Sequence, residues 1–203
     1  LNNQYEGTGE IDAYSVFGQG GVAPLAKSVH VALYTGDELS SIEQYAMIET
    51  INDKKFMTKH FGNTWTLYEV EYNEIETKKD KSIDVNTTVA YHNYILNELP
   101  FSAMNAENII NYFASERITL HWDGACYKEW KNNYYIAFNG VEYFFIPHGL
   151  DSTFQCEYTA LKNMQPVCLP MKECFSNTSC LSYLKDVETK LRGGITIREN
   201  KQL

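Results

Sequence analysis

The stretch that decides the fold is 132–147, which has the sequence NNYYIAFNGVEYFFIP. Two runs of mostly aromatic and β-branched residues lie on either side of Asn139-Gly140. Such residues favour strands, and Asn-Gly is the strongest short-range signal for a two-residue hairpin turn. The sequence therefore predicts an antiparallel hairpin in which Phe138 pairs with Val141. Its two strands are expected at 133–138 and 141–146.

This register fixes which residues gather at the open end of the hairpin. Continuing it places Asn133 opposite Ile146, with Asn132 one position further out. The chain enters the hairpin from the segment that contains Asp123 and leaves it through the segment that contains Asp151. Two carboxylates and an amide pair are therefore expected to converge on one edge.

That set of side chains suits phosphoryl transfer. One carboxylate orients the attacking hydroxyl, while an Asn and a second carboxylate hold Mg²⁺ between the phosphates. Protein kinases have the order Asp, Asn, hairpin, Asp, and this chain keeps that order, although Asp123 precedes Asn133 by ten residues rather than about five. Taken singly, Asp123-Gly124 would be an ordinary turn and Asp151 a helix cap. The order and the shared edge favour the functional interpretation.

The same stretch resembles the spore-coat protein H family (CotH kinases), atypical kinases of secreted or spore-surface proteins. The family has WDG after a helix, NNYY at the start of a strand, and IP, LD and TF after the hairpin. Over residues 20–155, the matching motifs are Trp122-Asp123-Gly124, Asn132-Asn133-Tyr134-Tyr135, Ile146-Pro147, Leu150-Asp151 and Thr153-Phe154, preceded by Ile48-Glu49, Phe61-Gly62 and Leu67-Tyr68-Glu69.

The resemblance implies a role for each matched residue. Asp123 would be the catalytic carboxylate, and Asp151 would hold the metal together with Asn133 or its neighbour Asn132. Glu49 would lie in the nucleotide-binding lobe. ATP and Mg²⁺ are the implied cofactors, with Mn²⁺ as a substitute, and a protein hydroxyl is the implied acceptor.

The chain departs from the family at two points. Between Pro147 and Leu150 the family carries an aromatic and an acidic residue, and this chain has His148 and Gly149. A kinase also needs a cation on the phosphates. The available lysines are Lys27, Lys54, Lys55 and Lys59, each better explained as a solvated surface lysine, and a cation before Leu1 is the alternative. His121 is expected to be structural.

The implied fold is α+β, an atypical protein-kinase-like fold with two lobes in a single domain over residues 1–203. Residues 1–72 would form a truncated N-lobe with a small antiparallel sheet, from strands at 29–35, 44–51 and 64–72. A helix capped by Asn52 and ended by Gly62 would lie within it. Residues 73–203 would form a helical C-lobe, with the charged segment 73–81 as a boundary loop, helices over 88–99 and from Asn105, and a cysteine-containing tail. Gly18-Gln19-Gly20-Gly21 is expected to be a turn rather than a phosphate loop.

The charge excludes a general nucleic-acid binder. The chain has 203 residues, of which 26 are acidic and 17 basic, giving a formal net charge of −9. A nucleic-acid binder shows a basic face instead. No apolar run approaches the roughly 20 residues of a membrane span. Because the chain begins at Leu1 rather than Met, we expect a fragment or a processed chain, with other domains of a longer protein among its partners.

The cysteines predict disulfides, with buried free thiols as the alternative. Their spacings differ from the short gaps of a zinc site, and one would be left to pair outside the fragment. Two glycosylation sequons begin at Asn86 and Asn177 and suit a secretory protein. We therefore expect an extracellular, cell-surface or spore-surface location. The five cysteines are Cys126, Cys156, Cys168, Cys174 and Cys180.

Three functions compete at this stage. The first is a protein kinase that uses ATP and Mg²⁺. The second is a catalytically weak or inactive module of the same fold that serves as a coat or adhesion protein, which the departures at His148 and Gly149 favour. The third is hydrolysis of a glycan by Asp123 and Asp151, in which the Asn pair would have no role.

Overall fold

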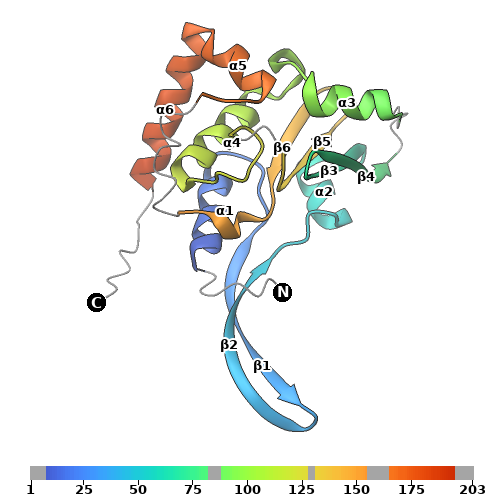
Figure 1. Cartoon of the computed structure of the whole chain (residues 1–203), viewed down its shortest axis with the longest axis vertical. Helices are drawn as coiled ribbons and strands as arrows, with labels where there is room; N and C mark the ends of the chain where they lie inside the picture. Colours follow the sequence, from blue (N-terminus) through green and yellow to red (C-terminus); the bar gives the residue numbers. More distant parts are fainter. Residues whose placement is uncertain (1–7, 82–87, 128–130, 155–164, 195–203) are drawn as a thin grey trace.

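The chain folds into an α+β structure, seen in a computed structural model that describes residues 8–81, 88–127, 131–154 and 165–194. Helices surround a four-stranded sheet, and a two-stranded arm extends from this body (Figure 1). The elements are α1 (Thr8–Gly20), β1 (Ala26–Thr35), β2 (Glu38–Ile48), α2 (Lys54–Phe61), β3 (Trp65–Glu71), β4 (Glu74–Lys81), α3 (Val89–Asn97), η1 (Phe101–Ala103), α4 (Ala106–Thr119), β5 (Tyr134–Phe138), β6 (Tyr143–Pro147), η2 (Leu150–Ser152), α5 (Leu169–Phe175) and α6 (Thr178–Gly194).

The central sheet has the strand order β4-β3-β5-β6, and all its pairings are antiparallel. Alternate residues of a strand point to opposite sides of the sheet, and both faces of this sheet are covered by apolar side chains. Tyr68 and Ile136 belong to the larger core, which includes α4, whereas Leu67 and Tyr135 belong to a smaller core with α2. The sheet is thus a rigid middle layer between two apolar clusters.

Helix α4 lies in the middle of the larger core. Asn105 caps it, since its Oδ1 accepts a hydrogen bond from the backbone N of Asn108 at 3.0 Å, as the sequence predicted. The side chain of Asn108 then joins the helix to the sheet, because its Oδ1 accepts from Phe145 N at 2.7 Å and its Nδ2 donates to Phe145 O at 3.1 Å. Helix and sheet are therefore fixed to each other by polar as well as apolar contacts.

Strands β1 and β2 form a separate two-stranded sheet that projects from the body (Figure 1). We expected these strands to share a sheet with the strand at 64–72, and this was wrong: β3 pairs with β4 and β5 instead. The arm carries much of the exposed apolar surface of the described residues, with Tyr34 62%, Leu39 53%, Ile42 62% and Met47 43% exposed.

The charged segment 73–81 is not a loop. Residues Glu74–Lys81 form β4, the edge strand beside β3, and the two strands are joined at Tyr72 and Asn73, which both have positive φ. Edge strands commonly carry charged side chains, which prevent pairing with other chains. The composition that suggested a loop is thus the composition of an exposed edge.

The hairpin at Asn139-Gly140 exists, but its register differs from the prediction. Phe138 pairs with Tyr143 rather than Val141, because Asn139 Oδ1 accepts hydrogen bonds from the backbone N of both Val141 and Glu142 at 2.9 Å and makes a longer turn. The shift is two residues, so every side chain keeps its predicted face. At the open end, the residue opposite Asn133 is now His148 rather than Ile146.

Two predictions near the start of the chain also need correction. Gly18, Gly20 and Gln19 belong to the last turn of α1, a helix that we did not predict, and the backbone N of Gly21 donates to Phe17 O at 3.1 Å. Helix α2 is present and ends at Gly62 as predicted, but its N-cap position is held by Asp53 rather than Asn52.

Two disulfides confirm the interpretation of the cysteines. Cys126 is bonded to Cys168, and Cys174 to Cys180, whereas Cys156 lies outside the described residues. Disulfides of this kind are typical of proteins from oxidising compartments such as the extracellular space. Among the described helices, none has the length and hydropathy that a membrane span requires.

We expect the two disulfides to contribute unequally to stability. The Cys126–Cys168 bond closes 42 residues and the Cys174–Cys180 bond only 6. Loop-closure entropy then predicts a loss of about 4 kcal/mol for Cys126→Ala with Cys168→Ala, and about 2 kcal/mol for the other pair. Urea unfolding of the two double variants measures this difference, and equal losses would contradict it.

Candidate functional site

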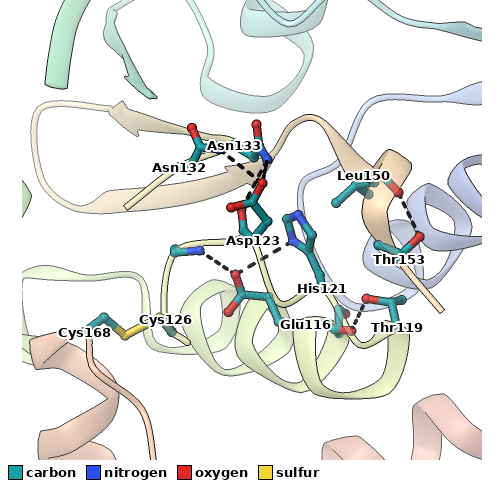
Figure 2. A network of polar contacts seen from close by, with 12 residues as sticks. Glu116, Thr119, His121, Asp123, Cys126, Asn132, Asn133, Leu150, Thr153 and Cys168 are labelled. Carbon is teal, nitrogen blue, oxygen red and sulfur yellow. Dashed lines mark hydrogen bonds and ion pairs between the residues drawn. A yellow bond between two sulfur atoms is a disulfide. The ribbon is translucent and has the colours of Figure 1, made fainter. Parts of the chain in front are cut away.

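The turn that carries Asp123 follows directly from the end of α4. Leu120 leaves the helix in the left-handed conformation, and the chain then folds back over the helix. The backbone N of Ala125 donates to Glu116 Oε1 at 2.7 Å (Figure 2). A Cβ at Gly124 would lie only 2.1 Å from that same oxygen, so the close approach of the turn to the helix requires glycine here.

Glu116 and His121 form a fully buried polar contact beneath this turn. Both side chains are 0% exposed, and Glu116 Oε1 lies 4.0 Å from His121 Nδ1. Burial raises the pKa of the Glu116 carboxyl to about 8 and lowers the pKa of the His121 imidazole to about 3. His121 is therefore neutral, and the contact is not an ion pair. This supports the structural role expected for His121.

Two amides hold the Asp123 carboxylate. Its Oδ2 accepts hydrogen bonds from Asn133 Nδ2 at 3.0 Å and from Asn132 Nδ2 at 3.3 Å, and Asn133 Nδ2 also lies 3.2 Å from the Asp123 carbonyl oxygen. Figure 2 shows the three side chains meeting above the Glu116–His121 contact. The structure thus brings together Asp123 and the Asn pair, as the hairpin argument predicted.

The two asparagines differ in what else they contact. Asn132 is buried, and its Oδ1 accepts from the backbone N of Tyr72, so it links Asp123 to the turn between β3 and β4. Asn133 adopts a positive φ of 56°, and its side chain lies against Gly149, where a Cβ would be 2.7 Å from Asn133 Oδ1. Of the two, Asn133 has its side-chain oxygen directed toward the loop that carries Asp151.

A polar pocket of about 590 Å³ lies at this end of the sheet. Three of the predicted site residues line it: Glu49, Asn133 and Asp151. Asp123 and Asn132 are not part of its lining, and Asp123 is joined to it through the hydrogen bond to Asn133. The other lining residues are Glu10, Tyr14, Ile48, Thr50, Ile51, Asn52, Tyr135, His148 and Gly149.

The pocket is acidic. Three carboxylates line it, from Glu10, Glu49 and Asp151, and the described lining contains no Lys or Arg. The lysines considered from the sequence, Lys27 among them, are therefore not in this pocket. Burial, together with Glu10 and Asp151, raises the pKa of the Tyr14 hydroxyl, and burial lowers the pKa of His148. The negative charge of the three carboxylates favours binding of a cation, or of a ligand that carries a cation with it.

Sequence reasoning missed Glu10, Tyr14 and Glu116. The first two lie on α1, whose apolar residues recur with helical spacing at Ala13, Val16 and Phe17, a signal that we did not use. Glu116 follows Ile109 by seven residues and so lies on the apolar stripe of α4. A carboxylate on a buried stripe marks a polar group with a specific partner.

No protein-family model matches this chain, and no curated protein matches it significantly.

The buried carboxyl of Glu116 should make stability depend on pH. Between the ordinary Glu pKa and about 8, the folded chain holds a proton that the unfolded chain has released, so stability falls as the pH rises. Unfolded His, with a pKa of about 6.5, is still partly charged at pH 7, so the histidines whose pKa is lowered in the folded chain add an opposing slope that fades as the pH approaches 8. Between pH 7 and pH 8 we therefore expect a fall smaller than the roughly 1.4 kcal/mol per pH unit of one full proton.

Urea unfolding at several pH values in this range measures the slope. Glu116→Gln, which keeps an oxygen for Ala125 N, should abolish it, whereas the exposed Glu107→Gln on the same helix should leave it unchanged. A wild-type stability that is flat over this range, or a slope that survives in Glu116→Gln, would contradict the assignment.

Proposed function

We propose that this chain is a secreted or surface-located, CotH-like kinase domain that transfers the γ-phosphoryl group of ATP to a protein hydroxyl. The observation that carries the proposal is the link from Asp123 through Asn133 to the pocket that Asp151 and Glu49 also line. It joins a held carboxylate to a pair of oxygen donors, which is the set that phosphoryl transfer requires.

In this proposal Asp123 accepts or orients the proton of the acceptor hydroxyl. Its hydrogen bonds to Asn132 and Asn133 fix the direction of the carboxylate, which is the positioning that such transfers depend on. Asn133 Oδ1 and the Asp151 carboxylate are hard oxygen donors on facing loops, and they fit Mg²⁺. Bound there, the ion would neutralise charge on the phosphates. Glu49, at the base of the arm, also lines the pocket and would face the nucleotide in this proposal.

A second candidate is a catalytically weak or inactive module of the same class that acts as a coat or adhesion protein. One observation favours it: the described pocket lining contains three carboxylates and neither Lys nor Arg. ATP would then depend on the metal alone for charge compensation. Nucleotide binding and phosphoryl transfer separate the two candidates.

The first test is thermal stability with ATP and Mg²⁺. A ligand that binds only the folded chain stabilises it and so raises the melting temperature. At a ligand concentration a hundredfold above Kd, the free energy of unfolding rises by about 2.7 kcal/mol. We expect a shift with ATP and Mg²⁺ together, little with ATP alone, and none in Asp151→Ala. Glu38→Gln at the tip of the arm is the control and should shift like wild type. No shift in wild type would count against the proposal.

The second test is phosphoryl transfer from labelled ATP by Asp123→Asn. This variant keeps a side-chain oxygen for the Asn pair, so its unfolding free energy should change by no more than about 1 kcal/mol. Transfer should fall by about 100-fold or more, as is typical for loss of a general base. Nucleotide binding with no transfer in wild type would favour the binding module, and an unchanged rate in the variant would exclude the role of Asp123.

A further inference from the structure

Three side chains of types that bind metals lie on the central sheet at the edge of the pocket, and one of them, His148, also lines it. Glu69 and Glu71 are two residues apart on β3 and therefore point to the same face. His148 follows the end of β6 at the same end of the sheet. One ligand atom from each of these three residues lies within 4.8 Å of the others.

Tyr135 of β5 supports this cluster from between β3 and β6. It pairs with Glu69 across the strands, and its hydroxyl donates to Glu69 Oε1. Its ring packs edge-on to the His148 ring with 5.2 Å between centroids. The backbone N of His148 donates to Asn133 O at 3.1 Å, which anchors the residue after β6. Two of the three side chains are thus held by neighbours on the sheet.

We propose that Glu69, Glu71 and His148 bind a divalent first-row transition-metal ion such as Zn²⁺ or Mn²⁺. Two carboxylate oxygens and one imidazole nitrogen suit these ions, whereas Mg²⁺ prefers oxygen ligands alone. Metal–ligand bonds of about 2.0–2.2 Å require the ligand atoms to approach to roughly 3–3.5 Å of one another. Glu71 is exposed and can rotate to close the site, while Glu69 and His148 are half-buried and form its fixed part.

Lys78 already forms an ion pair with one carboxylate of the cluster, Glu69. Its Nζ lies 2.5 Å from Glu69 Oε2 and 2.9 Å from Glu76 Oε2. A bound metal ion would displace the ammonium group from Glu69 and leave it on Glu76, whose side chain is 72% exposed. Lys78 therefore competes with the ion for the same carboxylate. Removing its charge should therefore strengthen metal binding.

Titration calorimetry with Zn²⁺ on the chelator-treated full chain, without nucleotide, tests the proposal. We expect one ion per chain, with affinity reduced by about 100-fold or more in Glu71→Gln and in His148→Phe, since even loss of an outer-shell partner costs about 10–100-fold. His148→Phe keeps an aromatic ring against Tyr135. Lys78→Met should bind several-fold more tightly, and Glu38→Gln, with the same charge change as Glu71→Gln, should bind like wild type.

The proposal does not rest on the kinase-like function, and its failure would leave that function untouched. It is overturned if wild type binds no Zn²⁺, or if Glu71→Gln binds as well as wild type. Since Glu71 is exposed, that variant stays informative even if His148→Phe does not fold. Equal weakening in Asp151→Ala would place the ion in the pocket and would also overturn the proposal.

Discussion

The constraint on which the candidate site depends is the carboxyl group of Glu116, buried beneath the turn that carries Asp123. It accepts the backbone N–H of Ala125, and it occupies the space that a side chain at position 124 would need. A buried polar group without a partner is costly, so the turn must stay where it satisfies this oxygen. His121 fills the space beside it as a neutral imidazole. The position of Asp123 is therefore fixed from below, by the core of the protein.

The Asp123 carboxylate is also fixed from the opposite side, by residues at the edge of the sheet. Asn132 joins it to the turn between β3 and β4, and Asn133 joins it to the pocket. The two adjacent asparagines share Asp123 but differ in their second contact, because Asn132 Oδ1 accepts from Tyr72 N, whereas Asn133, with a positive φ of 56°, has its Oδ1 next to Gly149. Tyr135, two residues further along β5, borders both the pocket and the cluster of Glu69, Glu71 and His148. The pocket and the cluster are therefore neighbours on the same sheet.

The sequence predicted the parts of this arrangement that depend on local patterns. The cap at Asn105 and the hairpin around Asn139 follow from side chains that bond to nearby backbone, and both are present. The register differed because Asn139 bonds to two backbone N–H groups, which strand pattern alone does not reveal. Strand β4 was missed since an edge strand need not be apolar. Glu10 reaches the pocket through tertiary packing of α1, for which no local signal exists.

The Cys126–Cys168 bond turns part of the chain into a closed covalent ring. The ring contains β5, β6 and η2, and with them Asn133, His148 and Asp151, while Asp123 lies three residues outside its start. In the unfolded chain the disulfide keeps the two ends of this segment together. These groups are therefore closer to one another, on average, than in the reduced unfolded chain. In topological terms, five of the twelve described residues that line the pocket belong to this ring, and the other seven come from α1 and from residues 48–52 outside it.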